Sequence, residues 1–130
     1  MYYIINWVDI SPPYAWVSDN GLGFVDAGDS VTINANVWDY CSNVSYVYAE
    51  VESPDETVVD TVQLFDDGLH YDDSAGDGVF GNSWVTDDSE MDYYIDLNVS
   101  DIWNNSYTYN NSDKITTNTV SYTHLTLPTN

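Results

Sequence analysis

The sequence predicts an all-β protein, a β-sandwich of about seven strands, on the strength of three observations. Short runs in which apolar and polar residues alternate recur along the 130 residues, and this period of two is typical of half-buried strands. Turn-forming Gly, Asn, Asp, Ser and Pro separate the runs at intervals of roughly 8 to 12 residues. No run of roughly ten residues has the apolar spacing of three and four that an amphipathic helix needs. We therefore expect one domain.

Residues 1–27 are predicted to be the N-terminal strand and lead-in of this domain. The apolar run at residues 3–10 favours a strand, and the two prolines behind it favour a break or an edge position. Turn sequences follow at residues 19–23 and 27–30, because Gly, Asn and Asp tolerate the positive φ of turns. The short apolar pair between the two turns is expected to form a brief strand contact.

Residues 28–119 are predicted to be the body of the same domain. Residues 31–37 alternate without a fault, which predicts a strand with one face in the core. Further strands are expected at residues 45–51, 57–65, 79–85, 93–99 and 106–109, the last two joined by a hairpin connection. The side chains expected to face the core are Val31, Ile33, Ala35, Val37, Val47, Ala49, Val51, Tyr93, Ile95, Leu97 and Val99.

Residues 120–130 are predicted to be a non-native tail. They contain no acidic residue, an abrupt change from the rest of the chain, and they resemble the translation of a transposase sequencing adapter. Such scars are excluded from fold reasoning, so His124 is set aside as a functional candidate. We expect the natural sequence to be interrupted near Thr119.

The net charge limits which kinds of partner the protein can bind. The chain has 22 acidic residues against a single lysine, for a formal net charge of −21. Nucleic acids and anionic membranes are bound through Lys and Arg, so both are excluded as partners. No apolar run approaches the roughly 18 residues of a membrane span, so no membrane insertion is expected from this segment. The acidic surface suits an extracellular or cell-surface setting, where salt screens it.

Cys41 is the only cysteine, which excludes an internal disulfide and a cysteine-based zinc site. We expect a small, half-buried residue beside a strand end, with a reactive or intermolecular thiol as the alternative.

An acidic stretch at residues 65–81 holds five aspartates and four glycines between two apolar runs. Dense carboxylates on a flexible backbone are what a Ca²⁺ site requires. The alternative is that each carboxylate caps a turn by accepting nearby backbone N–H groups, while the glycines supply positive φ. Both alternatives concern the same side chains, which are Asp66, Asp67, Asp72, Asp73 and Asp77.

Three segments resemble a known family. The string DDGLHYDDSAGDGVF at residues 66–80 resembles the acidic signature of secreted prokaryotic immunoglobulin-like modules. The string GDSVTINANV at residues 28–37 is similar to their second strand, and YYIDLNVSD at residues 93–101 is similar to the end of their sixth. The resemblance implies an immunoglobulin-like Greek-key sandwich, similar to fibronectin type III and cadherin-like domains. It also implies a stalk, linker or adhesion unit beside neighbouring domains of a larger exported protein, or an appendage of a secreted enzyme.

Aromatic residues suggest a second function. Five tryptophans and 12 tyrosines exceed what a small core needs. Trp38, Tyr46, Tyr48 and Trp103 are candidates for a sugar-stacking platform, which would make the chain a carbohydrate-binding module with glycans as partners. The alternative is that these rings pair across strands and stabilise a sheet.

Four asparagines begin Asn-x-Ser sequons and are candidate glycosylation sites: Asn43, Asn98, Asn104 and Asn110. Such a density fits an exported glycoprotein. Asn98 is expected to be exposed, because its neighbours in the alternating strand face inward.

No catalytic constellation is visible in the sequence. Glycoside hydrolysis by paired carboxylates needs one acid in an apolar pocket, whereas the aspartates of residues 65–81 lie among other acids and turns. His70 has no Ser or Cys nucleophile at a strand–turn–helix elbow, so it is expected to pack in its loop or bond a neighbouring aspartate. The chain is therefore predicted not to be an enzyme.

Overall fold

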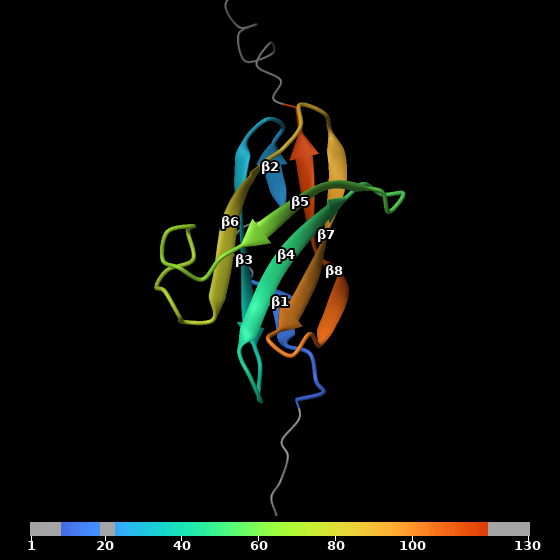
Figure 1. Cartoon of the computed structure of the whole chain (residues 1–130). Coiled ribbons are helices and arrows are strands. Elements are labelled where there is room, and N and C mark those ends of the chain that lie inside the picture. Colours follow the sequence, from blue (N-terminus) through green and yellow to red (C-terminus); the bar gives the residue numbers. More distant parts are fainter. Residues whose placement is uncertain (1–8, 19–22, 120–130) are drawn as a thin grey trace, which may run out of the picture.

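The protein is an all-β sandwich, as the sequence predicts. A computed structural model describes residues 9–18 and 23–119 and shows two sheets packed face to face (Figure 1). Its strands are β1 (Tyr14–Val17), β2 (Phe24–Asp26), β3 (Ser30–Trp38), β4 (Val44–Glu52), β5 (Val58–Leu64), β6 (Val79–Val85), β7 (Met91–Asp101) and β8 (Ser106–Asn118). The order is β1-β3-β6 in the three-stranded sheet and β2-β8-β7-β4-β5 in the five-stranded sheet. Among the described residues, no helix is long and apolar enough to cross a membrane.

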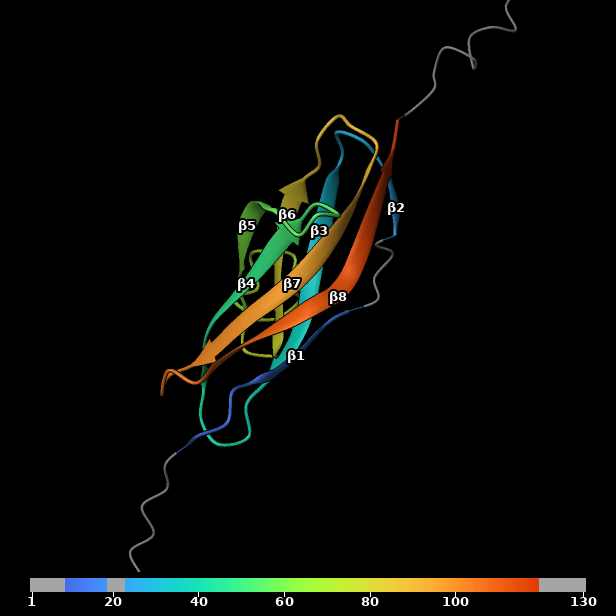
Figure 2. The same cartoon turned by 90° about the vertical axis from the view of Figure 1, so that its right-hand side faces the viewer.

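The strand directions divide the loops between two poles. Neighbouring strands are antiparallel except for β2 and β8, which are parallel. The start of β1, the β3–β4 loop and the β7–β8 turn lie at one pole, which we name the Asp9 pole (Figures 1 and 2). The β6–β7 loop and the end of β8 lie at the opposite pole, which we name the Thr119 pole. The described chain therefore enters at one end of the sandwich and leaves at the other.

The core lies between the two sheets and consists of the residues that alternation predicts. Every side chain expected to face inward on β3, β4 and β7 is at least nine-tenths buried, which confirms those assignments. Ala15 of β1, Leu64 of β5, Trp84 of β6 and Ile115 of β8 complete the core. Strand β7 lies between β4 and β8 in the middle of its sheet, and for this reason it also buries polar side chains on its outer face, including Asp96.

The structure extends the last strand beyond its predicted end. The alternating pattern stops at residue 109, but β8 continues to Asn118 through the polar residues 110–114. A bulge makes this continuation work: Asn111 adopts a positive φ of 51°, and its N–H donates to Asp96 Oδ1 at 2.7 Å. Pairing with β7 then resumes, so the polar run is held by backbone bonds rather than by burial.

Parts of the predicted organisation fall outside the described residues. The strand expected at residues 3–10 lies largely outside them, as does most of the turn at 19–23. The tail expected at residues 120–130 lies wholly outside them.

Candidate functional site

The Asp-rich loop, residues 66–78, carries the chain from β5 of one sheet to β6 of the other and forms the excursion at the side of the sandwich in Figure 1. Paired backbone hydrogen bonds between Phe65 and Gly81, of 3.0 and 2.8 Å, close its base. The Asn34 side chain on β3 donates to the Tyr71 carbonyl at 2.7 Å and holds the far part of the loop. The loop is thus docked on the three-stranded sheet.

Asp66 ties the two ends of this loop together. Its carboxylate accepts the backbone N–H groups of Gly76 at 2.9 Å, Asp77 at 3.3 Å and Gly78 at 3.0 Å. Burial raises the pKa of Asp66 above its ordinary value, and the three hydrogen bonds offset only part of that rise. Its oxygens are therefore already used by the backbone.

Asp72 lies inside the loop and is fully buried. Its two oxygens accept the N–H groups of Gly68 at 2.7 Å and His70 at 2.9 Å. Burial acts to raise the pKa of Asp72, but the backbone hydrogen bonds outweigh it, so the net pKa lies below its ordinary value. A buried carboxylate held by backbone amides is a structural centre for the turn around it.

Asp67 and His70 form a pair on the outside of the loop. Asp67 Oδ1 accepts the Leu69 N–H at 2.8 Å, and the Asp67 carboxylate lies 2.8 Å from His70 Nδ1. The hydrogen bond with His70 lowers the pKa of Asp67. The imidazole also stacks on Phe65, with ring centroids 4.3 Å apart. The prediction that His70 packs in its loop and bonds a neighbouring aspartate is confirmed.

The remaining loop aspartates are exposed. Asp77 accepts the Val79 N–H at 2.9 Å and the Ser74 N–H at 3.3 Å, and the bond to Val79 lowers its pKa. Asp73 adopts a positive φ of 67°, a turn conformation that Asp tolerates. Asp66, Asp67, Asp72 and Asp77 thus each accept hydrogen bonds from a separate set of backbone amides. Among the described residues, no three loop carboxylates approach one another closely enough to share a metal ion.

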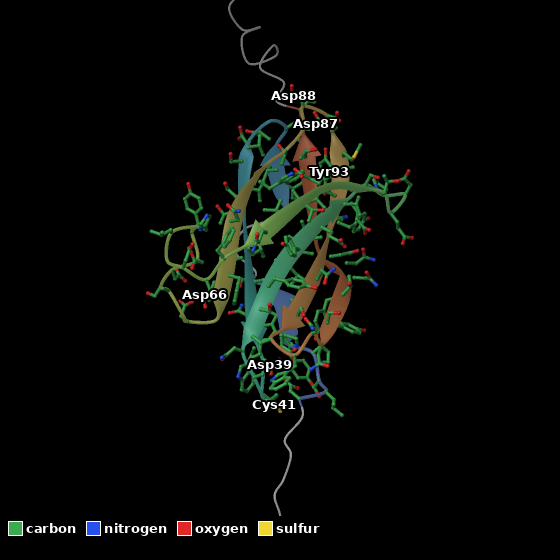
Figure 3. The ribbon with its side chains drawn as sticks, viewed as in Figure 1. Asp39, Cys41, Asp66, Asp87, Asp88 and Tyr93 are labelled. Carbon is green, nitrogen blue, oxygen red and sulfur yellow. The ribbon has the colours of Figure 1, made fainter. Side chains whose placement is uncertain are left out.

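Three other aspartates, far apart in the sequence, meet at the Asp9 pole. Asp9 precedes β1, Asp39 opens the β3–β4 loop, and Asp101 ends β7. One carboxylate oxygen of each lies within 4.8 Å of the corresponding oxygens of the other two. Figure 3 shows Asp39 at this pole, at the opposite end of the molecule from Asp87 and Asp88. We call this group the Asp triad.

Two members of the Asp triad are almost wholly buried: Asp101 is 0% exposed and Asp9 is 7% exposed. Asp101 accepts the N–H of Trp103 at 2.8 Å and both the N–H and the side-chain amide of Asn105 at 3.0 Å. Asp9 accepts the Ser11 N–H at 3.0 Å and the Ser42 hydroxyl at 2.6 Å. Both oxygens of each carboxylate therefore have donors.

Asp39 is different, because one of its oxygens has no partner. Its Oδ1 accepts the N–H groups of Cys41 at 2.9 Å and Ser42 at 2.8 Å. Its Oδ2 is buried and, among the described residues, has no hydrogen-bond donor. Burial acts to raise the pKa of Asp101, but hydrogen bonds from Asn105 and the turn outweigh it, so the net pKa is lowered. Among the described residues, the triad thus has one buried oxygen without a donor.

The triad offers oxygen ligands only, which suits a hard cation such as Ca²⁺ and not a metal that prefers sulfur or imidazole. The chain matches no family model, no curated protein and no solved structure. The geometry of the sites and the chemistry of their side chains must therefore carry the functional argument.

A third acidic contact lies on the outer face of the five-stranded sheet. Glu52 of β4 shares a hydrogen bond with Asp96 of β7, whose own partner on β4 is Glu50. Burial, then this hydrogen bond and the charge of Asp96, raise the pKa of Glu52 to about 7. Here two acids meet without a counter-charge, and one of them holds a proton near neutral pH.

The four aromatic residues predicted to form a sugar platform do not all share one face. Trp38 follows the buried Val37 on the three-stranded sheet, and it is 54% exposed on that sheet's outer side. Tyr46 and Tyr48 flank the buried Val47 on the five-stranded sheet, half-buried and paired with ring centroids 5.2 Å apart. The two sets thus lie on opposite sides of the sandwich. Trp103, the fourth, is exposed in the β7–β8 turn.

A different set of aromatic rings surrounds a hollow at the Asp9 pole. The hollow has a volume of about 410 Å³ and is lined by Tyr14, Tyr40, Tyr107 and Tyr109, with Asp39 at its edge. The rings of Tyr14 and Tyr40 pack edge to face, with their centroids 6.2 Å apart. The Tyr109 hydroxyl donates to a backbone carbonyl ahead of β1 at 2.7 Å. We call this feature the tyrosine hollow.

Three of the four sequon asparagines are exposed, which leaves them accessible for glycosylation: Asn43, Asn104 and Asn110. The expectation that Asn98 is exposed is wrong. It is half-buried, because β7 is a central strand and places Asn98 between Tyr48 of β4 and Thr108 of β8.

The expectation that Cys41 is half-buried is also wrong. Cys41 lies in the β3–β4 loop at the Asp9 pole and is exposed (Figure 3). Its backbone N–H is bound by Asp39, which holds the residue in a tight turn and leaves the thiol outside.

Sequence reasoning missed both features of the Asp9 pole. Asp39 and Asp101 each stand two residues after a predicted strand, and Asp9 stands shortly before the proline break. The position of these aspartates near strand ends could have indicated a site. The sequence does not reveal the strand order, however, and the strand order decides which strand ends lie close together.

Proposed function

We propose that this chain is a non-catalytic immunoglobulin-like module that acts as a spacer or adhesion unit in a larger exported or cell-surface protein. The observation that carries the proposal is the placement of the described chain ends at opposite poles of a closed sandwich. A module entered at one pole and left at the other extends a chain of domains in line, as a stalk or linker requires.

The strand order supports an immunoglobulin-like topology. Such sandwiches place their third, sixth and seventh strands in one sheet and their first, second and fifth in the other. When the short strand β2 is left out of the count, β4, β7 and β8 are the third, sixth and seventh strands, and they form the middle of the larger sheet. The first, second and fifth strands are then β1, β3 and β6, which form the smaller sheet. The extra strand β5 extends the larger sheet beside β4, as in variable-type domains.

The surface chemistry supports a place outside the cell. A formal charge of −21 with a single lysine keeps modules apart and soluble, and it disfavours nucleic acid and anionic lipid as partners. Three exposed sequons fit the same setting.

Small-angle X-ray scattering on two copies of the chain joined in tandem tests the spacer role. We expect an elongated particle whose largest dimension is about twice that of one copy, because the ends of each copy point in opposite directions. Copies that fold back on one another would contradict the proposal. A panel of glycoside and ester substrates tests the non-catalytic part, which turnover of any of them would refute.

A second candidate function is carbohydrate binding, and the tyrosine hollow is the observation that favours it. Aromatic ring faces beside a carboxylate provide stacking and a hydrogen-bond acceptor for a neutral sugar. A glycan array comparing the chain with Tyr40→Ala tests this function. Binding that is lost in Tyr40→Ala but kept in Tyr46→Ala, a change on the outer face of the five-stranded sheet and away from the hollow, would favour carbohydrate binding over the spacer role.

A further inference from the structure

We propose that the Asp triad, Asp9, Asp39 and Asp101, binds a divalent cation, and that this cation is Ca²⁺. The proposal is independent of the spacer role. Three buried or half-buried carboxylates converge without a basic side chain, and one of their buried oxygens has no donor.

The convergence is built by the fold from three separate segments. The Ser42 hydroxyl of the β3–β4 loop donates to Asp9 at 2.6 Å, and the Asn105 side chain of the β7–β8 turn donates to the Asp9 carbonyl at 2.6 Å. The Ile102 N–H donates to the Asn43 carbonyl at 3.0 Å and joins the loop to the turn. These bonds fix the three segments relative to one another, so the carboxylates are held together before any ion arrives.

Among the described residues, no Lys or Arg side chain accompanies the triad. The sequence has one Lys or Arg, Lys114, which is paired with Tyr94 in the half of β8 nearer the Thr119 pole. Buried charges in proteins are either paired or bound to metal ions, because leaving them unpaired in a low-dielectric site is costly.

The unpartnered oxygen indicates where ligation capacity remains. Both oxygens of Asp9 and of Asp101 accept hydrogen bonds, as does Asp39 Oδ1, whereas Asp39 Oδ2 is buried and accepts none among the described residues. A carboxylate oxygen that already accepts one bond can still ligate an ion through another lone pair.

Oxygen-only ligands and irregular geometry suit Ca²⁺, which takes six to eight ligands and completes its shell with water and carbonyls. Mg²⁺ demands a near-ideal octahedron and gives up its water reluctantly. With three protein carboxylates, we expect a dissociation constant on the order of 10⁻⁴ to 10⁻³ M, the range of extracellular modules.

The test uses the full chain, freed of metal with a chelator, and CaCl₂ as the probe at constant ionic strength. Calorimetry and thermal melting follow the titration, with MgCl₂ as a parallel arm. The test variants are Asp39→Asn and Asp101→Asn, and the matched control is Asp73→Asn in the Asp-rich loop. Asp39→Asn keeps Oδ1 as an acceptor for its turn and replaces only the unpartnered oxygen.

For the unmodified chain we expect one saturable Ca²⁺ site and a rise in melting temperature of about 5 °C at millimolar Ca²⁺. Asp39→Asn should lose at least tenfold in affinity, although without Ca²⁺ it should melt no lower than the parent because a like charge is gone. Asp73→Asn should bind within about twofold of the parent.

Three results would overturn the proposal. These are no saturable Ca²⁺ effect on the parent chain, parental affinity in Asp39→Asn, or an equal loss in Asp73→Asn, which would move the site to the Asp-rich loop. Asp101 is fully buried, so the result for Asp101→Asn is used only if circular dichroism shows that this variant is folded. If it is not folded, Asp39→Asn alone decides the test.

Discussion

The Asp-rich loop and the Asp triad are two acidic regions with opposite relations between sequence and space. The loop has five aspartates within twelve residues, yet its carboxylates turn toward separate backbone amides. The triad draws one aspartate from each of three distant segments, yet its carboxylate oxygens lie within 4.8 Å of one another. A dense acidic sequence therefore does not by itself make a cation site.

The difference follows from how short-range and long-range geometry act on a carboxylate. An aspartate in a turn has N–H groups two residues on within easy reach, and these satisfy it locally. The contacts of an aspartate at a strand end depend on which other loops the fold brings to the same pole. The loop carboxylates accept hydrogen bonds from the loop's own N–H groups, whereas the triad has one buried oxygen, Asp39 Oδ2, without a donor among the described residues.

The largest effect we expect is on the loop, from Asp72→Ala. This change removes a fully buried carboxylate and leaves the N–H groups of Gly68 and His70 without acceptors. The free energy of unfolding should fall by roughly 3 kcal/mol, since two hydrogen bonds to a carboxylate are lost and each bond to a charged group contributes about 1.5–3 kcal/mol. Urea denaturation measures it. The loss should be the same with and without Ca²⁺, and a loss that depends on Ca²⁺ would break the distinction between the two regions.

A second change tests whether the loop is docked or free. A Cβ on Gly81 would lie 2.5 Å from Asn34 Nδ2 and 2.9 Å from the His70 carbonyl. Gly81→Ala should therefore lower the free energy of unfolding by about 2 kcal/mol, as overpacking does. Adding Asn34→Ala should recover only part of the loss, because the clash with the His70 backbone remains. No loss in Gly81→Ala would mean that the loop does not rest on β3.

The Glu52–Asp96 contact is a third acidic region, in which two carboxyl groups share a hydrogen bond. Its contribution to stability should depend on pH. The folded-state pKa of Glu52 is about 7 against 4.5 for the ordinary group, so the folded state holds the proton more tightly. Stability from this contact is present below about pH 4.5 and is lost as the pH rises to about 7.

Glu52→Gln should remove this fall. We expect the variant to gain on the order of 1 kcal/mol over the parent at pH 7, after allowance for solvent screening, and little at pH 4.5. Thermal melting across that pH range measures the difference. Parallel curves for the two proteins would contradict the raised pKa.

The smallest effect belongs to Asp73→Asn, an exposed loop residue at positive φ that Asn tolerates as well as Asp. Its free energy of unfolding should stay within about 0.5 kcal/mol of the parent by urea denaturation. A larger loss would mean that the Asp73 side chain, like those of Asp66 and Asp72, stabilises the loop through hydrogen bonds.

Much of the fold could be predicted because alternation reports burial directly. The run from Val31 to Val37 shows its core face in every second residue, and the structure buries those side chains. The far half of β8 could not be predicted in this way, since residues 110–114 are polar and are held by pairing with β7 and a bulge. Backbone pairing leaves no hydrophobic signal in a sequence.

The sites were harder to predict than the strands. Alternation assigns Tyr46 and Tyr48 to an outward face and leaves Trp38 at the end of a strand, but it does not say which sheet each strand belongs to. The structure puts Trp38 and Tyr46 on different sheets. Asn98 faces outward as alternation predicts, yet it is half-buried because β7 is a central strand and places it between Tyr48 and Thr108. The Asp triad depends entirely on strand order, a property of the whole chain rather than of any local stretch.

The parallel pairing of β2 with β8 has a mechanical consequence. Phe24, Val25 and Asp26 lie alongside Thr116, Thr117 and Asn118, and the chain reaches β2 from the Asp9 pole while β8 leaves at the Thr119 pole. Tension applied to the two ends would slide these strands along each other, so their hydrogen bonds would have to break together and not one at a time. The shortest strand pairing among the described residues is thus loaded in shear, the direction in which paired strands resist stretching most.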